Sequence, residues 1–179
     1  MEISILKLLR KRRSIRQFTK QSVEPDKIEK LIEAALRAPT SRGRNPWEFI
    51  VVTEPELIKQ LCKAKQHGSA FLSGAPLAIV VSADATKSDV WTEDCSIAAT
   101  LIQLTAEELG LGSCWVQIRL RPHNADCSAT DYLKDLLHLP ASHRLECIIG
   151  IGYPDETKAG HTLDELRFDQ VHRNKFGSR

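Results

Sequence analysis

Apolar and polar residues alternate with helical spacing in the first third of the chain. Five apolar residues follow the i, i+3, i+4, i+7, i+8 pattern of an amphipathic helix: Ile28, Leu31, Ile32, Ala35 and Leu36. Pro25 suits the first turn of this helix, and Pro39 marks its end. A shorter apolar stripe, Ile3, Leu6 and Leu9, predicts a brief helix before it.

Short apolar runs further along predict strands at 47–53, 77–83, 113–118 and 145–151. The run 77–83 is continuously apolar apart from one serine, as expected of a strand that is buried on both faces. Helices are predicted between the strands, one opening at Pro55 and one capped by Ser128 with Asp131. Because helices and strands are interspersed, the pattern predicts one α/β sandwich around a central sheet, a single domain over 1–179.

The longest predicted helix covers 91–109, and Gly110 is its expected C-terminal stop. One stripe of this helix contains small side chains among larger ones: Cys95, Ala98, Ile102, Thr105 and Leu109. Small residues allow close packing against another helix, which makes this helix a candidate for the core of a dimer.

Composition narrows the class of protein. The chain has 179 residues, of which 42% are hydrophobic, enough for a core, but no apolar run is long enough to span a bilayer. Five cysteines without a Cys-x-x-Cys pair, and no signal-peptide pattern, favour free thiols in a reducing cytoplasm. Six histidines without an i,i+4 pair argue against a metal site.

Charge is small overall but unevenly placed. The formal net charge is +2, yet residues 1–16 carry six basic residues against one acidic residue, and the remainder is net negative. Arg12, Arg13, Ser14 and Arg16 could together neutralise a phosphate. The charge pattern alone favours a solvated basic helix end, and a nucleic-acid surface is a weak alternative because the other 163 residues are net acidic.

No familiar catalytic or nucleotide-binding motif is present. Gly110 and Gly112 lack the third glycine of a dinucleotide fingerprint and follow a helix instead of a strand. The polar loop 39–46 lies between two core elements, where binding residues are common, although a plain connection is equally compatible.

Four segments in order and at matching spacing resemble the nitroreductase family of FMN-dependent oxidoreductases: RRSIRQF (12–18), APTSRGRNPWEF (38–49), ELGLGSCWVQI (108–118) and IGIGYP (149–154). The resemblance covers essentially the whole chain. It implies an α+β fold with a central, mainly antiparallel sheet flanked by helices, and a homodimer with FMN between the protomers.

The resemblance also assigns residues to the cofactor. Arg12, Ser14 and Arg16 match the positions that hold the FMN phosphate and ribityl chain, with Arg13 beside them. Lys158 lies near a late basic position that assists the phosphate, and Arg167 is a second candidate.

The isoalloxazine ring is expected to meet two further segments. Pro39, Thr40 and Ser41 match residues that reach the flavin of the other protomer, and Asn45 matches a nearby family position. The backbone of Val116, Gln117 and Ile118 aligns with the strand that approaches flavin N5, although many relatives have Gly or Pro in place of Gln117.

The implied activity is hydride transfer from NADH or NADPH through flavin N5 to a nitroaromatic, a quinone or a similar small acceptor, by a ping-pong mechanism. No protein side chain is expected to carry the chemical step, because the cofactor does so. The alternatives are a family branch with other flavin chemistry, such as dehalogenation or flavin breakdown, and a non-catalytic flavin- or nucleotide-binding regulator. Neither a membrane nor a nucleic acid is an expected partner.

Overall fold

Four strands form one antiparallel sheet in the computed structural model, which describes residues 4–178. The strands are β1 (Trp47–Val52), β2 (Leu77–Asp84), β3 (Gly112–Gln117) and β4 (His143–Gly152). They lie in the order β1-β2-β4-β3, so the long strands β2 and β4 are central and β3 forms one edge. The four predicted strands and the antiparallel sheet are therefore confirmed.

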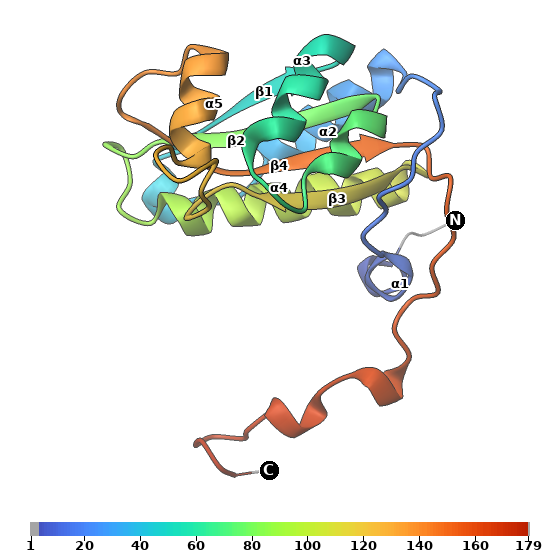
Figure 1. Ribbon diagram of the computed structural model, residues 1–179. Helices are drawn as coiled ribbons and strands as arrows, with labels where there is room; N and C mark the ends of the chain where they lie inside the picture. The colour runs from blue at the N-terminus through green and yellow to red at the C-terminus, as the bar shows by residue number, and fades with distance from the viewer. Residues whose placement is uncertain (1–3, 179) are drawn as a thin grey trace.

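Residues 4–178 form five α-helices (Figure 1), of which the last four flank the sheet: α1 (Ile5–Lys11), α2 (Pro25–Leu36), α3 (Pro55–Leu61), α4 (Trp91–Glu108) and α5 (Ala129–Leu137). The helices α2 and α4 cover one face of the sheet, and α3 and α5 cover the other. Pro25 and Pro55 occupy the first turns of their helices, as predicted. Ile3 of the predicted N-terminal stripe lies outside the described residues. No helix among residues 4–178 combines the length and apolar content needed to cross a bilayer.

The two layers of helices bury β2 on both faces. Leu77, Ile79 and Val81 point into the α2/α4 layer, whereas Ala78 and Val80 point into the α3/α5 layer. All five are at most 1% exposed. The uninterrupted apolar run is thus explained by burial on two sides, each side chain contributing about 25 cal/mol per Å² of apolar surface removed from water.

The small-residue stripe of α4 packs inside its own protomer. Cys95, Ala98 and Ile102 are fully buried against the sheet and α2. This stripe is therefore already covered by the same chain, and the prediction that the helix contributes to a dimer core concerns the rest of its surface. The opposite side of α4 is the one that meets solvent, where Ile97 is 41% exposed.

A β-bulge in β4 sets the end of β3. Val81 of β2 pairs with Cys147 and Ser82 pairs with Leu145, which leaves Glu146 as the extra residue. The Glu146 carbonyl accepts hydrogen bonds from the amides of Ile118 and Arg119, both at 3.1 Å. These bonds turn the chain out of the sheet directly after Gln117.

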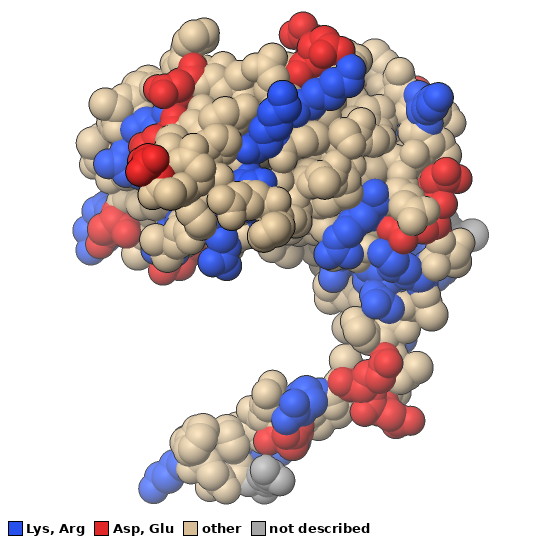
Figure 2. Space-filling view, viewed as in Figure 1, with Lys and Arg blue, Asp and Glu red and all other residues tan. Residues whose placement is uncertain are grey.

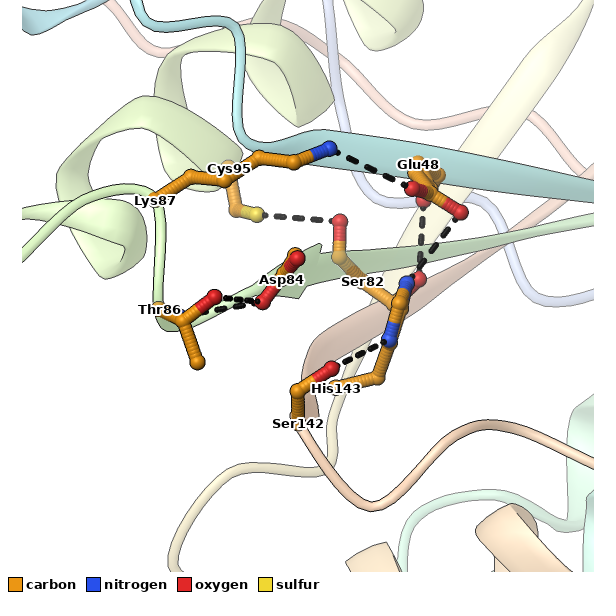
Figure 3. A network of polar contacts seen from close by, with 8 residues as sticks. All are labelled: Glu48, Ser82, Asp84, Thr86, Lys87, Cys95, Ser142 and His143. Carbon is orange, nitrogen blue, oxygen red and sulfur yellow. Dashed lines mark hydrogen bonds and ion pairs between the residues drawn. The ribbon is translucent and has the colours of Figure 1, made fainter.

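Polar side chains join β1, β2 and β4 at one end of the sheet (Figure 3). The buried His143 places Nε2 3.1 Å from the Glu48 carboxylate, and Ser82 Oγ donates to the Glu48 carbonyl at 3.0 Å. Lys87 approaches the same carboxylate at 3.9 Å. These contacts fix the ends of the strands to one another.

The C-terminal segment leaves the body of the protein as an extended arm (Figure 1). The arm, defined as residues 162–178, contains only two short 3-10 helices, Leu163–Glu165 and Phe168–Gln170. Its large apolar side chains are all exposed: Leu163, Leu166, Phe168, Val171 and Phe176. The arm therefore has apolar surface that its own protomer does not cover.

Gly110 ends α4 in a left-handed conformation, with φ +75°. Its amide donates to the Glu107 carbonyl at 3.2 Å, and the following amide of Leu111 donates to Ala106 at 2.8 Å. A Cβ at Gly110 would meet no atom within 4 Å, so only the backbone conformation opposes a side chain there.

Gly110→Ala should accordingly lower the free energy of unfolding by about 1–2 kcal/mol, the cost of a left-handed non-glycine residue. Urea denaturation measures this change. Gly74→Ala is the matched control, because Gly74 also has open space around it but no positive φ. Equal effects of the two substitutions would contradict the explanation by backbone strain.

Candidate functional site

The segment 12–18 lies along the outer edge of β3. The amide of Ile15 donates to the Ser113 carbonyl at 3.0 Å, and Ser14 pairs with Ser113 in a parallel bridge. Ile15 is buried, and a Cβ on Gly112 would approach the Ile15 side chain to 2.8 Å. The absence of a side chain at Gly112 is thus what lets this segment dock on the sheet.

The docked segment directs several basic side chains into one cavity of about 430 Å³. Its lining contains Arg12, Arg13, Ser14, Arg16, Lys158 and His161. Among the described residues, none of the three arginines has a carboxylate within ion-pair distance. Figure 2 shows Lys and Arg side chains gathered on this side of the molecule, where the C-terminal arm leaves the body.

The chain after β4 braces this cavity. Lys158 Nζ donates to the Ser14 carbonyl at 2.9 Å and pairs with Glu156 at 3.0 Å. Glu156 also accepts from the backbone amides of Arg16 and Gln17, and the bond from Arg16 followed by that from Lys158 lowers the pKa of its carboxyl. Arg13 donates to the carbonyl of Ala159. Residues far apart in sequence thereby hold the cationic cavity open.

The rest of the outer edge of β3 has no strand beside it in the described structure. In an antiparallel ladder the hydrogen-bonding groups of successive residues point to opposite sides. The Ile118 amide points toward β4, where it meets Glu146, and the Ser113 carbonyl points outward to Ile15. The amides of Trp115 and Gln117 therefore also point outward, beyond the last strand.

The side chain of Gln117 has a structural task. Its amide nitrogen lies 3.3 Å from the buried carboxylate of Glu146, and its oxygen accepts from the Trp115 indole at 2.8 Å. Burial raises the pKa of Glu146, and the bond from Gln117 opposes that rise. Only the backbone of Gln117 is thus available at the sheet edge.

Two further cations, which the sequence patterns did not single out, lie near this edge. Burial lowers the pKa of Lys65, and the charge of Arg121 lowers it further, while the thiol of Cys114 has the opposite effect. Cys114 itself is buried on β3, and burial raises its pKa against the charges of Arg16, Lys158 and Arg12. Only the fold reveals these two cations, because it brings Lys65 close to Cys114 and Arg121 close to Lys65.

The loop 39–46 is held in a defined shape at the start of α4. Arg42 and Asn45 both have positive φ, and the Thr40 hydroxyl donates to the Asn45 side chain at 2.8 Å. Asp94, which is 2% exposed, accepts from the Ser41 amide at 2.9 Å and from the Ser88 hydroxyl at 3.1 Å. Such strain is typical of binding loops that their surroundings hold in place.

The two groups of predicted residues lie at opposite ends of α4. Lys11, next to the cationic segment, pairs with Glu107 at 2.9 Å, whereas Ser41 is bound to Asp94. The two anchors, Asp94 and Glu107, are 13 positions apart along the helix, which is about 20 Å at 1.5 Å per residue. One protomer thus brings Arg12, Ser14, Arg16 and Lys158 together with the edge of β3, but it does not bring the loop 39–46 to them.

Arg167 lies apart from this cavity. It is exposed in the C-terminal arm and pairs with Asp169 at 2.7 Å. Of the two late basic residues considered from the sequence, the structure therefore places only Lys158 at the cationic cavity.

Comparison with known proteins identifies the class to which this fold and site belong. The model of the nitroreductase family matches residues 9–65 and 60–153, and the chain belongs to that family. A protein provisionally named NADH dehydrogenase/NAD(P)H nitroreductase from Archaeoglobus fulgidus is 36% identical over 177 residues, covering 96% of this chain and 98% of the relative.

Two further relatives show the breadth of the family. A structure described as an FMN-dependent nitroreductase from Clostridium difficile R20291 aligns with a TM-score of 0.94 at 47% identity, covering 96% of this chain and 99% of that one. An iodotyrosine deiodinase from Thermotoga neapolitana is 25% identical over 189 residues, covering 89% of this chain and 93% of the relative.

Asp94→Ala should release the loop 39–46. Loss of a buried acceptor leaves the Ser41 amide and the Ser88 hydroxyl without their partner, which costs about 1–3 kcal/mol of stability. Amide hydrogen exchange at Ser41 should become faster, as mass spectrometry or NMR can show. Asp94→Asn keeps an acceptor oxygen and should retain slow exchange; fast exchange in both variants would mean that charge, and not the hydrogen bond, orders the loop.

Proposed function

We propose that the chain binds FMN along the outer edge of β3 and uses it to transfer hydride from NADH or NADPH to a nitroaromatic, a quinone or a similar small acceptor by a ping-pong mechanism. The observation that carries the proposal is a cavity of arginines that no carboxylate of residues 4–178 pairs with, next to a sheet edge with outward-pointing amides. Such a cavity suits a phosphate group, and such an edge suits a planar ring with hydrogen-bonding atoms.

The residues present fit FMN better than a dinucleotide. FMN ends in one phosphate with nearly two negative charges, and Arg12, Arg16 and Lys158 supply the opposite charge around Ser14. When bound, FMN supplies the hydride-accepting and hydride-donating chemistry. Membership of the nitroreductase family and the FMN-dependent relative from Clostridium difficile support the same choice.

The remaining roles in this proposal fall to backbone groups and cations of the chain. The outward amide of Gln117, with Val116 and Ile118 as its neighbours on the strand, would be the backbone donor available to flavin N5. Lys65, which interacts electrostatically with Cys114 on β3, and Arg121, whose charge acts on Lys65, would stabilise negative charge on the ring. Backbone hydrogen bonds and fixed positive charges are enough to hold the ring, so the binding needs no proton transfer from a side chain.

A second copy of the chain completes the proposed site. Pro39, Thr40, Ser41 and Asn45 lie about 20 Å along α4 from the phosphate cavity, so they serve the flavin of the partner protomer. The exposed apolar side chains of the C-terminal arm support a permanent dimer, because they lack cover in one protomer.

An absorbance scan of the purified protein before and after boiling tests the cofactor. Released FMN should amount to about one per chain, as expected where the cofactor carries the chemistry. A colourless protein that added FMN cannot reconstitute would overturn the proposal. Steady oxidation of NADH or NADPH with a quinone or nitroarene would separate the enzyme from a non-catalytic flavin-binding regulator.

Arg12→Ala should weaken FMN binding by roughly 1.5–3 kcal/mol, the scale of a hydrogen bond to a charged group. Fluorescence titration of the apoprotein with FMN gives the affinity. Arg10→Ala removes the same charge from the exposed helix α1, outside the cavity lining, and should change the affinity little. Full flavin affinity in the Arg12 variant would disprove the phosphate assignment.

Replacing Leu166 and Phe168 with serine should weaken the dimer at least about tenfold, because each buried apolar side chain contributes about 1.5–3 kcal/mol. Both residues are exposed within one protomer, so their loss should not unfold it. Analytical ultracentrifugation measures the dimer dissociation constant. Asp164→Ser, in the same arm, is the control; an unchanged dimer in the double variant would place the interface elsewhere.

A further inference from the structure

A second, larger cavity lies beyond the end of β3, on the side of α5. Its volume is about 780 Å³, within the usual range for small-molecule sites. The chain segment that leaves β3 forms one wall, and the first turns of α5 and the start of β4 form the others. This cavity shares no lining residue with the arginine cavity at 12–16, the family motifs do not use it, and of the proposed flavin contacts only Arg121 lines it.

The lining of this second cavity is cationic. Arg119, Arg121, Lys134 and Arg144 line it together with only two acidic residues, which leaves a net formal charge of +2. Within residues 4–178, none of the four cations has a carboxylate within ion-pair distance. Unpaired cations that share one cavity repel one another, so an anion that enters is stabilised by all of them.

Two of these cations are held in place by the same backbone atom. Lys134 Nζ donates to the carbonyl oxygen of Ala141 at 2.9 Å, and Arg144 donates to the same oxygen at 2.7 Å. Arg144 also donates to the His143 carbonyl at 2.8 Å. The two charges are therefore fixed side by side at the far wall of the cavity, which reduces the entropy lost when they bind a ligand.

The opposite wall combines a cation with apolar surface. The Arg119 guanidinium lies over the Trp91 ring, 5.9 Å from its centroid. Leu120 is 76% exposed and has φ +58°, a left-handed conformation that is strained for a leucine. A leucine held outward in this way offers apolar contact to the body of a ligand whose charged end reaches Lys134 and Arg144.

The cavity also adjoins the proposed reaction site. Arg119 and Arg121 line the cavity and are bound at the end of β3: the Arg119 amide donates to the Glu146 carbonyl and the Arg121 amide donates to the Ile118 carbonyl, both at 3.1 Å. We propose that this cavity binds the anionic end, a carboxylate or phosphate, of a reactant whose reducible or oxidisable end lies at the edge of β3. This inference rests on the proposed function and adds a substrate class to it, namely anionic reactants.

The test uses the FMN-loaded protein and a double variant, Lys134→Gln with Arg144→Gln. The acceptors 4-nitrobenzoate and 4-nitrobenzamide differ in charge but hardly in shape. If the acceptor supplies the anion, the ratio of the KM for 4-nitrobenzoate to the KM for 4-nitrobenzamide should rise about tenfold or more, the effect of losing a charged hydrogen bond. If the pyridine nucleotide supplies the anionic end, the KM for NADH or NADPH should rise instead. This KM is measured with menadione as a neutral acceptor.

Calorimetric titration provides a readout that does not need turnover. In the oxidised protein without reductant, 4-nitrobenzoate or NADP⁺ should bind about tenfold more weakly to the double variant than to the wild type. The control variant, Lys20→Gln with Lys63→Gln, removes two exposed charges outside the cavity lining and should match the wild type. Thermal unfolding and FMN content verify that each variant is folded and loaded.

The outcomes separate this inference from the function on which it rests. A wild-type protein without FMN or turnover contradicts the proposed function, whereas calorimetry on the same chain still tests the cavity. The cavity assignment alone is overturned if the double variant is flavin-loaded and active, shows neither KM effect, and binds both anions with unchanged affinity. Equal losses for 4-nitrobenzoate and 4-nitrobenzamide also overturn it, because the effect would then not depend on charge.

Discussion

The pairing of residues 14 and 15 with Ser113 is the interaction on which the site depends. An edge strand exposes a row of amides and carbonyls that require partners, and β3 is such a strand. The N-terminal segment covers the first part of this edge, and the bulge at Glu146 turns the chain away at the other end. Between these two points the outward amides of Trp115 and Gln117 have no strand beside them in the described structure. A planar ligand at this position would satisfy groups that the fold leaves open.

The helix α4 determines why one protomer holds only part of the proposed site. Its buried stripe is filled by its own sheet and by α2, so the helix is a rigid spacer with an anchor near each end. The Asp94–Ser41 bond orders the loop 39–46 near the start of α4, and the Lys11–Glu107 pair fixes the basic segment near its end. Because the helix cannot shorten, one protomer keeps these two places about 20 Å apart, which supports the proposal that a second protomer completes the site.

The sequence alone predicts the elements of this fold well and their long-range contacts poorly. The helical spacing of Ile28 to Leu36 and the apolar run 77–83 reflect burial along one segment, which local periodicity records directly. The strand order, the bulge at Glu146 and the proximity of Lys65 to Arg121 depend on contacts between distant segments, and no local pattern records them. The motif at 12–16 could be recognised because its residues are consecutive. In contrast, Glu156 binds this motif and Asp94 binds the loop 39–46 from distant parts of the chain.

At both cavities, cations without carboxylate partners lie close together. On the surface of a helix, a basic residue such as Lys11 is balanced by a nearby acid, here Glu107. Backbone contacts direct cations into each cavity: Arg12 and Arg16 into the first, and Lys134 and Arg144 into the second. None of these four cations has a carboxylate partner among the described residues. Keeping like charges close together costs free energy that an anionic ligand recovers. A net charge of +2 conceals this arrangement, because most of the acidic residues that balance the charge lie outside the two cavities.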